Sequence, residues 1–116
     1  MKNIILIGMP GAGKSTVGVL LAKSMGYDFV DADLVIQKQQ GTKLQNIIDE
    51  RGLDGFKQAE EQALLSINDK KAIIATGGSA VFSTAGMAHL KENGICVYLR
   101  VDEQELIRRL TNIKTR

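Results

Sequence analysis

The chain has 116 residues, of which 44% are apolar and 24% charged, with a single proline. This composition is typical of one globular domain and excludes disordered and fibrous classes, and no apolar run approaches the length that spans a membrane. The net charge of +2, from 15 basic and 13 acidic residues spread along the chain, excludes the strongly basic face of a nucleic-acid-binding protein.

Four short apolar runs predict strands, and each is followed by a segment of helical character. The predicted strands are Lys2–Ile7, Tyr27–Asp31, Ala72–Thr76 and Ile95–Val101. The runs at 4–7 and 72–75 are apolar without alternation, as expected for strands that are buried on both faces. Strands that alternate with helices favour a parallel sheet joined by right-handed crossovers. We therefore predict an α/β fold of three layers, with helices on both faces of a parallel sheet.

The helices are predicted from apolar spacing and from end signals. The first begins near Gly13 and ends at Gly26, which suits a left-handed C-cap. The stretch Thr-Lys-Leu-Gln at 42–45 fits a capping box that opens a short helix, which breaks at Gly52. A longer helix with one apolar face follows over 53–67.

The last part of the chain predicts two more helices around the final strand. Ser83 or Thr84 caps a helix that ends before Gly94, and acidic residues at 102–105 begin the last helix. Cys96 lies inside the final strand and has no second cysteine to pair with, which fits a reducing compartment. The N-terminus lacks the apolar core of a signal peptide, so we expect a cytoplasmic protein. We also expect it to be a monomer.

The stretch GMPGAGKST, from Gly8 to Thr16, follows the first strand and matches G-x-x-x-x-G-K-[ST] at every fixed position. Glycines let successive backbone N–H groups surround an anion, and the helix that follows adds the positive end of its dipole. Lys14 is expected to neutralise charge on the β and γ phosphates during transfer, and Ser15 to offer its hydroxyl to Mg²⁺. The residues expected to bind ATP here are Gly11, Ala12, Gly13, Lys14, Ser15 and Thr16.

The phosphate-binding motif alone is shared by kinases, GTPases and larger ATPases. The chain contains no Asn-Lys-x-Asp stretch that reads guanine, and its third strand ends in Thr-Gly-Gly rather than in paired acids. A kinase of small molecules, with the P-loop NTPase or nucleoside-monophosphate-kinase type of fold, is the better fit.

Asp31 and Asp33 close the second strand, at the sheet edge where parallel α/β folds bind ligands. Carboxylates at positions i and i+2 of an extended chain point the same way, so both are expected to face the cleft. Asp31 can then hold a metal-bound water, and Asp33 can draw the proton from an acceptor hydroxyl. The alternative is that Asp33 only caps the next helix.

In these features the chain resembles the shikimate kinase family over nearly its whole length. The matching segments are Gly8 to Thr16 with Val17-Gly18, Asp31-Ala32-Asp33, Phe56-Lys57-Gln58-Ala59-Glu60, Ala75-Thr76-Gly77-Gly78, and Arg108-Arg109-Leu110 leading to Arg116. The resemblance implies transfer of the γ-phosphate of ATP to a hydroxyl of shikimate, on the route to aromatic amino acids. It implies a magnesium site at Ser15 and Asp31, Asp33 as base, and a substrate site that includes Asp33, Lys57, Glu60, Gly77 and Gly78.

The chain departs from the family pattern at two positions of this substrate site. Lys57 replaces the arginine that grips the shikimate carboxylate, which keeps the charge but loses the two-pronged donor. The other reading of Lys57 is a solvated side chain paired with Glu60 or Glu61. Ser79 replaces a third glycine, and its hydroxyl either reshapes the pocket or caps the following helix.

The third departure is the end of the sequence. Family members continue beyond the position of Arg116 into a lid and a last strand, and Arg116 aligns with the lid arginine that contacts ATP. We therefore expect residues 1–116 to be a single kinase domain truncated at its C-terminus. Two alternatives stay open: a related kinase for another small polyol or hydroxy acid, and a nucleotide-binding module without catalysis.

Overall fold

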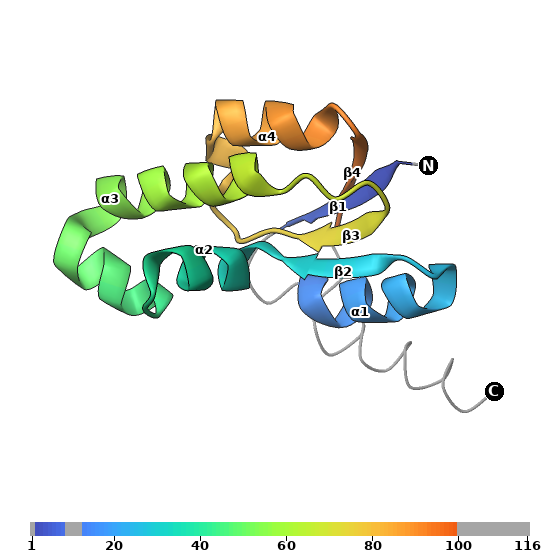
Figure 1. The fold of residues 1–116 in the computed structure, drawn as a ribbon, viewed down its shortest axis with the longest axis horizontal. Helices are drawn as coiled ribbons and strands as arrows, with labels where there is room; N and C mark the ends of the chain where they lie inside the picture. Colours follow the sequence, from blue (N-terminus) through green and yellow to red (C-terminus); the bar gives the residue numbers. More distant parts are fainter. Residues whose placement is uncertain (1, 9–12, 100–116) are drawn as a thin grey trace.

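The computed structural model describes residues 2–8 and 13–99, which form a four-stranded sheet covered by helices (Figure 1). The strands are β1 (Asn3–Ile7), β2 (Asp28–Asp31), β3 (Ala72–Ala75) and β4 (Gly94–Tyr98). All three pairings are parallel, and the strand order is β2-β3-β1-β4. Because the strands are parallel, the carboxyl ends of β1, β2 and β3 lie at one edge of the sheet, and the strand order places β3 between β1 and β2.

The helices lie on both faces of the sheet, as the sequence predicted. They are α1 (Lys14–Met25), α2 (Ala32–Gln40), α3 (Leu44–Ser66) and α4 (Thr84–Lys91), with a 3₁₀ turn, η1, at Ala80–Phe82. In Figure 1, α1 lies on one face, and α4 lies on the other beside the C-terminal part of α3. Helix α2 and the start of α3 extend past the carboxyl edge of the strands.

The buried side chains of β1 and β3 alternate between two cores. Ile5 and Ile74 pack with residues of α3 and α4, including Leu64 and Leu90. On the other face, a second core joins the two strands to α1 through Leu6, Ile73 and Ala22. All of β3 and most of β1 are buried, on both faces of the sheet, which explains why their sequences are apolar without alternation.

A third, smaller core joins α2 to α3 beyond the sheet, through Ile36, Ile47, Ala59 and Ala63. These four side chains are at most 2% exposed. Each buried isoleucine contributes about 1.5–3 kcal/mol relative to an exposed one, so this core fixes the two helices against each other. It therefore also fixes residues 57–60 of α3 relative to the end of β2.

Several helix ends follow the predicted signals. Gly26 adopts φ 69° as the C-cap of α1, and the side chain of Ser83 caps α4 by accepting a hydrogen bond from the Gly86 N–H at 3.1 Å. Gly52 has φ 72° and ψ −177°, so α3 is two helical segments joined at a kink at the predicted break.

The predicted capping box at 42–45 is wrong. Lys43 is the N-cap of α3 and makes no capping bond with its side chain. The Thr42 hydroxyl instead accepts from the side-chain amide of Asn46, and the Gln45 amide donates to Asp49. Each side chain thus bonds a residue one turn along the chain and not the backbone N–H groups at the helix start.

Strand β4 begins at Gly94 and includes Cys96, a free, half-buried cysteine that packs against the core formed with α3 and α4. The last helix, predicted from residues 102–105, lies outside the described residues. Within 2–8 and 13–99, no helix combines the length and the apolar character needed to cross a membrane.

Candidate active site

A cleft of about 330 Å³ opens at the carboxyl edge of the sheet, where the sequence placed the ligand site. Its walls come from the start of α1, the end of β2, the start of α2 and the turn after β3. The described lining residues are Gly13, Lys14, Ser15, Thr16, Asp31, Asp33, Ala75, Thr76, Gly77 and Gly78. Eight of these ten were predicted site residues, and Ala75 and Thr76 complete the wall between them.

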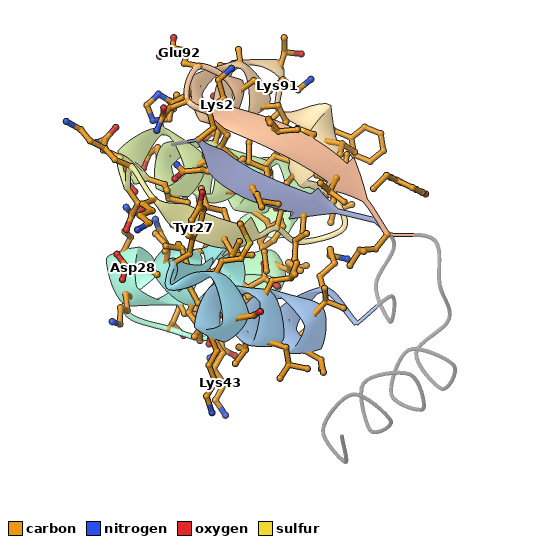
Figure 2. The ribbon with its side chains drawn as sticks, turned by 90° about the vertical axis from the view of Figure 1, so that its right-hand side faces the viewer. Lys2, Tyr27, Asp28, Lys43, Lys91 and Glu92 are labelled. Atoms are coloured by element: carbon orange, nitrogen blue, oxygen red, sulfur yellow. The ribbon has the colours of Figure 1, made fainter. Side chains whose placement is uncertain are left out.

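A larger cleft, of about 770 Å³, lies at the opposite edge and is lined by residues such as Asn3, Lys70 and His89. Figure 2 looks onto this amino edge, where Lys2, Asp28 and Glu92 lie. None of the predicted site residues lines it. The larger cleft is therefore not the candidate site, which is chosen by the chemistry of its lining residues.

Lys14 is the first residue of α1 and is only 9% exposed. Its ammonium donates a hydrogen bond to the carbonyl oxygen of Gly8 at 2.7 Å, across the base of the phosphate loop. Burial lowers the pKa of Lys14, and the nearby Asp33 carboxylate partly offsets this effect. The cation is thus held at the start of the helix, facing the cleft, by the loop to which it belongs.

Gly8, at the start of the loop, could not be another residue without a shift of the chain. Its φ is +151°, and a Cβ there would lie 2.8 Å from the carbonyl oxygen of Leu99. The chain that leaves β1 therefore passes close to the end of β4. This close approach explains the first glycine of the motif in physical terms.

Asp31 and Asp33 both line the cleft, but they do not belong to one extended segment as predicted. Asp31 ends β2, whereas Asp33 lies in the first turn of α2. Asp31, not Asp33, caps this helix: its Oδ1 accepts from the N–H groups of Asp33 at 2.9 Å and Leu34 at 3.4 Å. The alternative reading of Asp33 as a helix cap is therefore wrong, and its carboxyl is left to the cleft.

The Asp33 carboxyl is half-buried, and burial raises its pKa. The negative charge of Asp31 raises this pKa further, whereas Lys14 lowers it. A carboxylate whose pKa is raised holds a proton more strongly than an exposed one, which suits a group that accepts a proton during a reaction. Asp33 and Lys14 thus bring a carboxyl group and a cation into one cleft.

Gly77 lies where the Asp33 carboxyl comes closest to the turn after β3. A Cβ at Gly77 would lie 2.7 Å from the Oδ1 atom of Asp33 and 3.5 Å from the Oε2 atom of Glu60. A side chain at Gly77 would therefore force the Asp33 carboxyl to shift, whereas the Glu60 carboxyl would be in ordinary contact with it.

Lys57 and Glu60 line a second, smaller pocket of about 180 Å³ with residues that include Ser79 and Phe82. Lys57 is exposed, and within the described residues it pairs with neither Glu60 nor Glu61. Glu60 is 2% exposed. Burial raises the pKa of Glu60, the hydrogen bond from Ser79 lowers it, and Asp33 raises it.

Two contacts at this site were missed by sequence reasoning. The Thr76 hydroxyl donates to the carbonyl oxygen of Leu6 at 2.8 Å, which ties the end of β3 to β1. The Ser79 hydroxyl does not cap the following turn but donates to the Glu60 carboxylate. Neither partner could be read from the sequence, because 70 and 19 residues separate the two groups in each pair.

The residues present fit a magnesium ion bound jointly by protein and phosphate. Ser15 and Asp31 line the same cleft and offer hydroxyl and carboxylate oxygens, the ligand type that Mg²⁺ prefers. No three His, Cys, Asp or Glu side chains gather into a metal site in the part of the chain that the structure describes. Mg²⁺ commonly needs only one or two protein groups when substrate phosphates supply the rest. Gly11, Ala12 and Arg116, which were predicted to bind ATP, lie outside the described residues.

Known proteins of one family are similar to this chain over most of its length. The family model described as Shikimate kinase matches residues 10–116. A shikimate kinase of Thermodesulfovibrio yellowstonii is 42% identical over 100% of this chain and 68% of its own length. One from Synechococcus is 44% identical over 93% of this chain and 55% of its own length.

Among solved structures, a shikimate kinase from Acinetobacter baumannii in complex with shikimate superposes with a TM-score of 0.81 and 36% identity. The match covers 100% of this chain and 65% of that one. The chain thus spans roughly two thirds or less of the length of these three relatives.

Proposed function

Because the chain belongs to the shikimate kinase family, we propose that the protein transfers the γ-phosphoryl group of ATP to a hydroxyl of shikimate, in aromatic amino-acid biosynthesis. The observation that carries the proposal is the cleft itself, where the Lys14 ammonium and the Asp33 carboxyl lie beside the phosphate loop. The relative solved with shikimate has the same fold over this whole chain, which supports the choice of acceptor. We place the reaction in the cytoplasm and assign it to a monomer.

In the proposed reaction, an oxygen of the acceptor hydroxyl attacks the γ-phosphorus while the bond from this phosphorus to the β–γ bridging oxygen breaks. ADP leaves, and the hydroxyl proton passes to the Asp33 carboxylate. Negative charge on the β and γ phosphates moves toward the leaving group during transfer, and Lys14 neutralises this charge. The residues Gly11, Ala12, Gly13 and Thr16 hold the phosphates, and Arg116 contacts ATP.

Ser15, and Asp31 through water, would hold Mg²⁺, which supplies positive charge to the phosphate oxygens when it is bound. The cap that Asp31 provides to α2 occupies its Oδ1, and its second carboxyl oxygen is the one assigned to a metal-bound water. The same hydrogen bonds orient the side chain. Asp31 thus joins the start of α2, and with it Asp33, to the magnesium site.

The acceptor is proposed to lie between the two pockets. Its reacting hydroxyl would face Asp33 and the backbone of Gly77 and Gly78, and its carboxylate would face Lys57 in the smaller pocket. Glu60, which lies between these pockets beside Gly77, would contact its other hydroxyls. A molecule with hydroxyls at one end and a carboxylate at the other has the charge pattern that this arrangement favours.

The proposal is tested by mixing the full-length protein with ATP, magnesium and shikimate and measuring ADP formation. We expect ADP to form at a rate that depends on shikimate. ATP binding without any shikimate-dependent ADP formation would contradict the proposal and favour a nucleotide-binding module. Turnover on another polyol or hydroxy acid, with shikimate a poor substrate, would favour the related kinase.

The lysine at position 57, where the family has an arginine, is the specific observation that favours a different acceptor. If the acceptor carboxylate does lie there, Lys57→Arg is expected to lower the KM for shikimate by about tenfold, because arginine binds a carboxylate with two parallel hydrogen bonds. Steady-state kinetics with Lys70→Arg as control measures this, since Lys70 lies in the cleft at the other sheet edge. An unchanged KM in Lys57→Arg would argue for an acceptor without a carboxylate at this position.

Gly77→Ala is expected to lower kcat/KM for the acceptor by about 10²-fold, because the new methyl group would displace the carboxyl of Asp33. The KM for ATP should change little, since the methyl group lies on the acceptor side of the cleft. Steady-state kinetics with each substrate varied in turn separates these effects. A wild-type kcat/KM for the acceptor in Gly77→Ala would contradict this prediction, because it would show that the Asp33 carboxyl can shift without loss of activity.

A further inference from the structure

Ser79 makes an unusual contact with a buried charge on α3. Its hydroxyl lies 2.9 Å from the Oε1 atom of Glu60 and 3.1 Å from Oε2, so that it donates to this carboxylate. Ser79 belongs to the turn after Gly78, and Glu60 to the C-terminal segment of α3. The contact therefore joins the turn that closes the main cleft to the helix that lines the smaller pocket.

Glu60 depends on this contact more than an exposed glutamate would. Within 2–8 and 13–99, the hydrogen bonds that the Glu60 carboxyl accepts come from Ser79, and no lysine or arginine of these ranges forms an ion pair with it. A buried carboxylate without partners is costly, and a donated hydrogen bond favours its charged form. The serine hydroxyl is thus the group that opposes the effect of burial on Glu60.

The same carboxyl group lies on the path between the two pockets. Its Oε2 faces Gly77, which also adjoins the Asp33 carboxyl, while Glu60 lines the smaller pocket with Lys57 and Phe82. A ligand that reaches from Lys57 to Asp33 must pass this carboxylate. The orientation of Glu60 therefore bears directly on acceptor binding.

We propose that Ser79 is a positioning residue for the acceptor: its hydroxyl holds the Glu60 carboxylate in one orientation, as the hydrogen-bond acceptor for a hydroxyl of the bound substrate. This inference rests on the proposed function and adds a determinant of specificity to it. Lys57, one turn earlier on α3, makes no ion pair with Glu60, whose carboxylate accepts hydrogen bonds from Ser79 instead. The charge of Lys57 stays available to an acidic group of the acceptor.

The test compares Ser79→Ala, which removes the hydroxyl, with Ser79→Thr, which keeps it. We expect Ser79→Ala to raise the acceptor KM by about tenfold, with kcat and the KM for ATP changed less than about twofold. Ser79→Thr should restore the wild-type acceptor KM. A wild-type acceptor KM in Ser79→Ala would overturn the proposal.

A second readout needs no turnover. Carbon-13 NMR of the labelled glutamate carboxyls, with the Glu60 signal assigned by its loss in Glu60→Gln, follows the titration of this group. In Ser79→Ala the Glu60 pKa should rise, because the donor that favours its charged form is gone. An unchanged titration would also overturn the proposal.

Ser83→Ala is the matched control, because Ser83 donates to the neighbouring Glu61 at 3.1 Å. It should lower the Tm through loss of the α4 cap but leave the Glu60 titration at its wild-type position. If the wild type forms no ADP with shikimate, the proposed function fails. The titration then still decides whether Ser79 holds Glu60.

Discussion

Replacing Asp33 by asparagine is expected to lower kcat for acceptor phosphorylation by about 10³-fold. Asparagine fills the same space beside Gly77 but cannot accept the proton of the attacking hydroxyl, and a positioned base contributes about 10²–10⁴-fold to such reactions. The KM for ATP should change little. Single-turnover measurements of phosphoryl transfer separate this chemical step from binding.

The pH dependence gives a second check on Asp33. Its pKa is raised by burial and then by the charge of Asp31, with Lys14 acting in the opposite direction. As the proposed base, Asp33 would work only when ionised, so kcat/KM of the wild type should fall as the pH drops through a value above the ordinary aspartate pKa of about 3.9. Asp33→Asn should lack this acidic limb.

The ionised Asp33 carboxyl is expected to support activity but to lower the free energy of unfolding. Because the folded state binds the Asp33 proton more tightly than the unfolded state does, the charged group costs stability once the pH rises through its folded pKa. Asp33→Asn is therefore expected to raise the Tm near pH 7 and to have little effect at acidic pH. A Tm lowered at pH 7 would show that the carboxylate stabilises the fold.

Asp28→Asn is a matched control for these measurements. Asp28 begins β2, at the amino edge of the same strand, and its side chain is exposed (Figure 2). Asp28→Asn should keep wild-type kinetics, including the fall in kcat/KM at acidic pH. A loss of activity in Asp28→Asn comparable to that in Asp33→Asn would indicate a general effect on β2 and contradict the assignment of Asp33 as base.

Replacing Lys14 by methionine is expected to lower kcat by about 10²–10³-fold, comparable to the loss of one donor that stabilises transition-state charge in other enzymes. Methionine keeps much of the buried aliphatic stem, so the change removes mainly the cation. The KM for ATP should rise as well, because in the proposed complex the ammonium would also face the phosphates before transfer. Steady-state kinetics together with calorimetric titration of ATP measures both effects.

Lys23→Met is the control for Lys14, because Lys23 lies in the last turn of the same helix and is exposed. It should retain wild-type kcat and ATP affinity. If Lys14→Met kept its kcat and lost only ATP affinity, Lys14 would be a binding residue and not one that acts on the transition state.

Short segments of the sequence were sufficient to predict much of the fold. The apolar runs of β1 and β3 predicted burial on both faces, because neither run offers a polar side chain to solvent. Gly26 and Gly52 both adopt the positive φ at the end or break that they predicted. The phosphate-loop motif is contiguous, so its position before α1 needed no knowledge of tertiary contacts.

Asp31 and Asp33 are residues whose local structure the sequence pattern predicted only in part. Their spacing correctly predicted that both face the cleft, but it assumed an extended chain through residue 33. The helix begins at Ala32, so Asp31 is used as its cap, while Asp33 is turned toward Gly77. Which carboxyl is held by backbone N–H groups depends on where the helix begins, and helix boundaries are weakly determined by sequence alone.

The sequence by itself determined a parallel α/β kinase fold, a phosphate loop and the family to which the chain is similar, because these depend on periodicity and contiguous motifs. Only the tertiary structure decided that Asp33 and Glu60 meet at Gly77, that Ser79 bonds Glu60, and that Lys57 lies in a separate pocket. The physical reason is the strand order β2-β3-β1, which brings the ends of distant segments together at one edge. Hydrophobic periodicity specifies which face of a strand is buried, but it does not specify which strand is its neighbour.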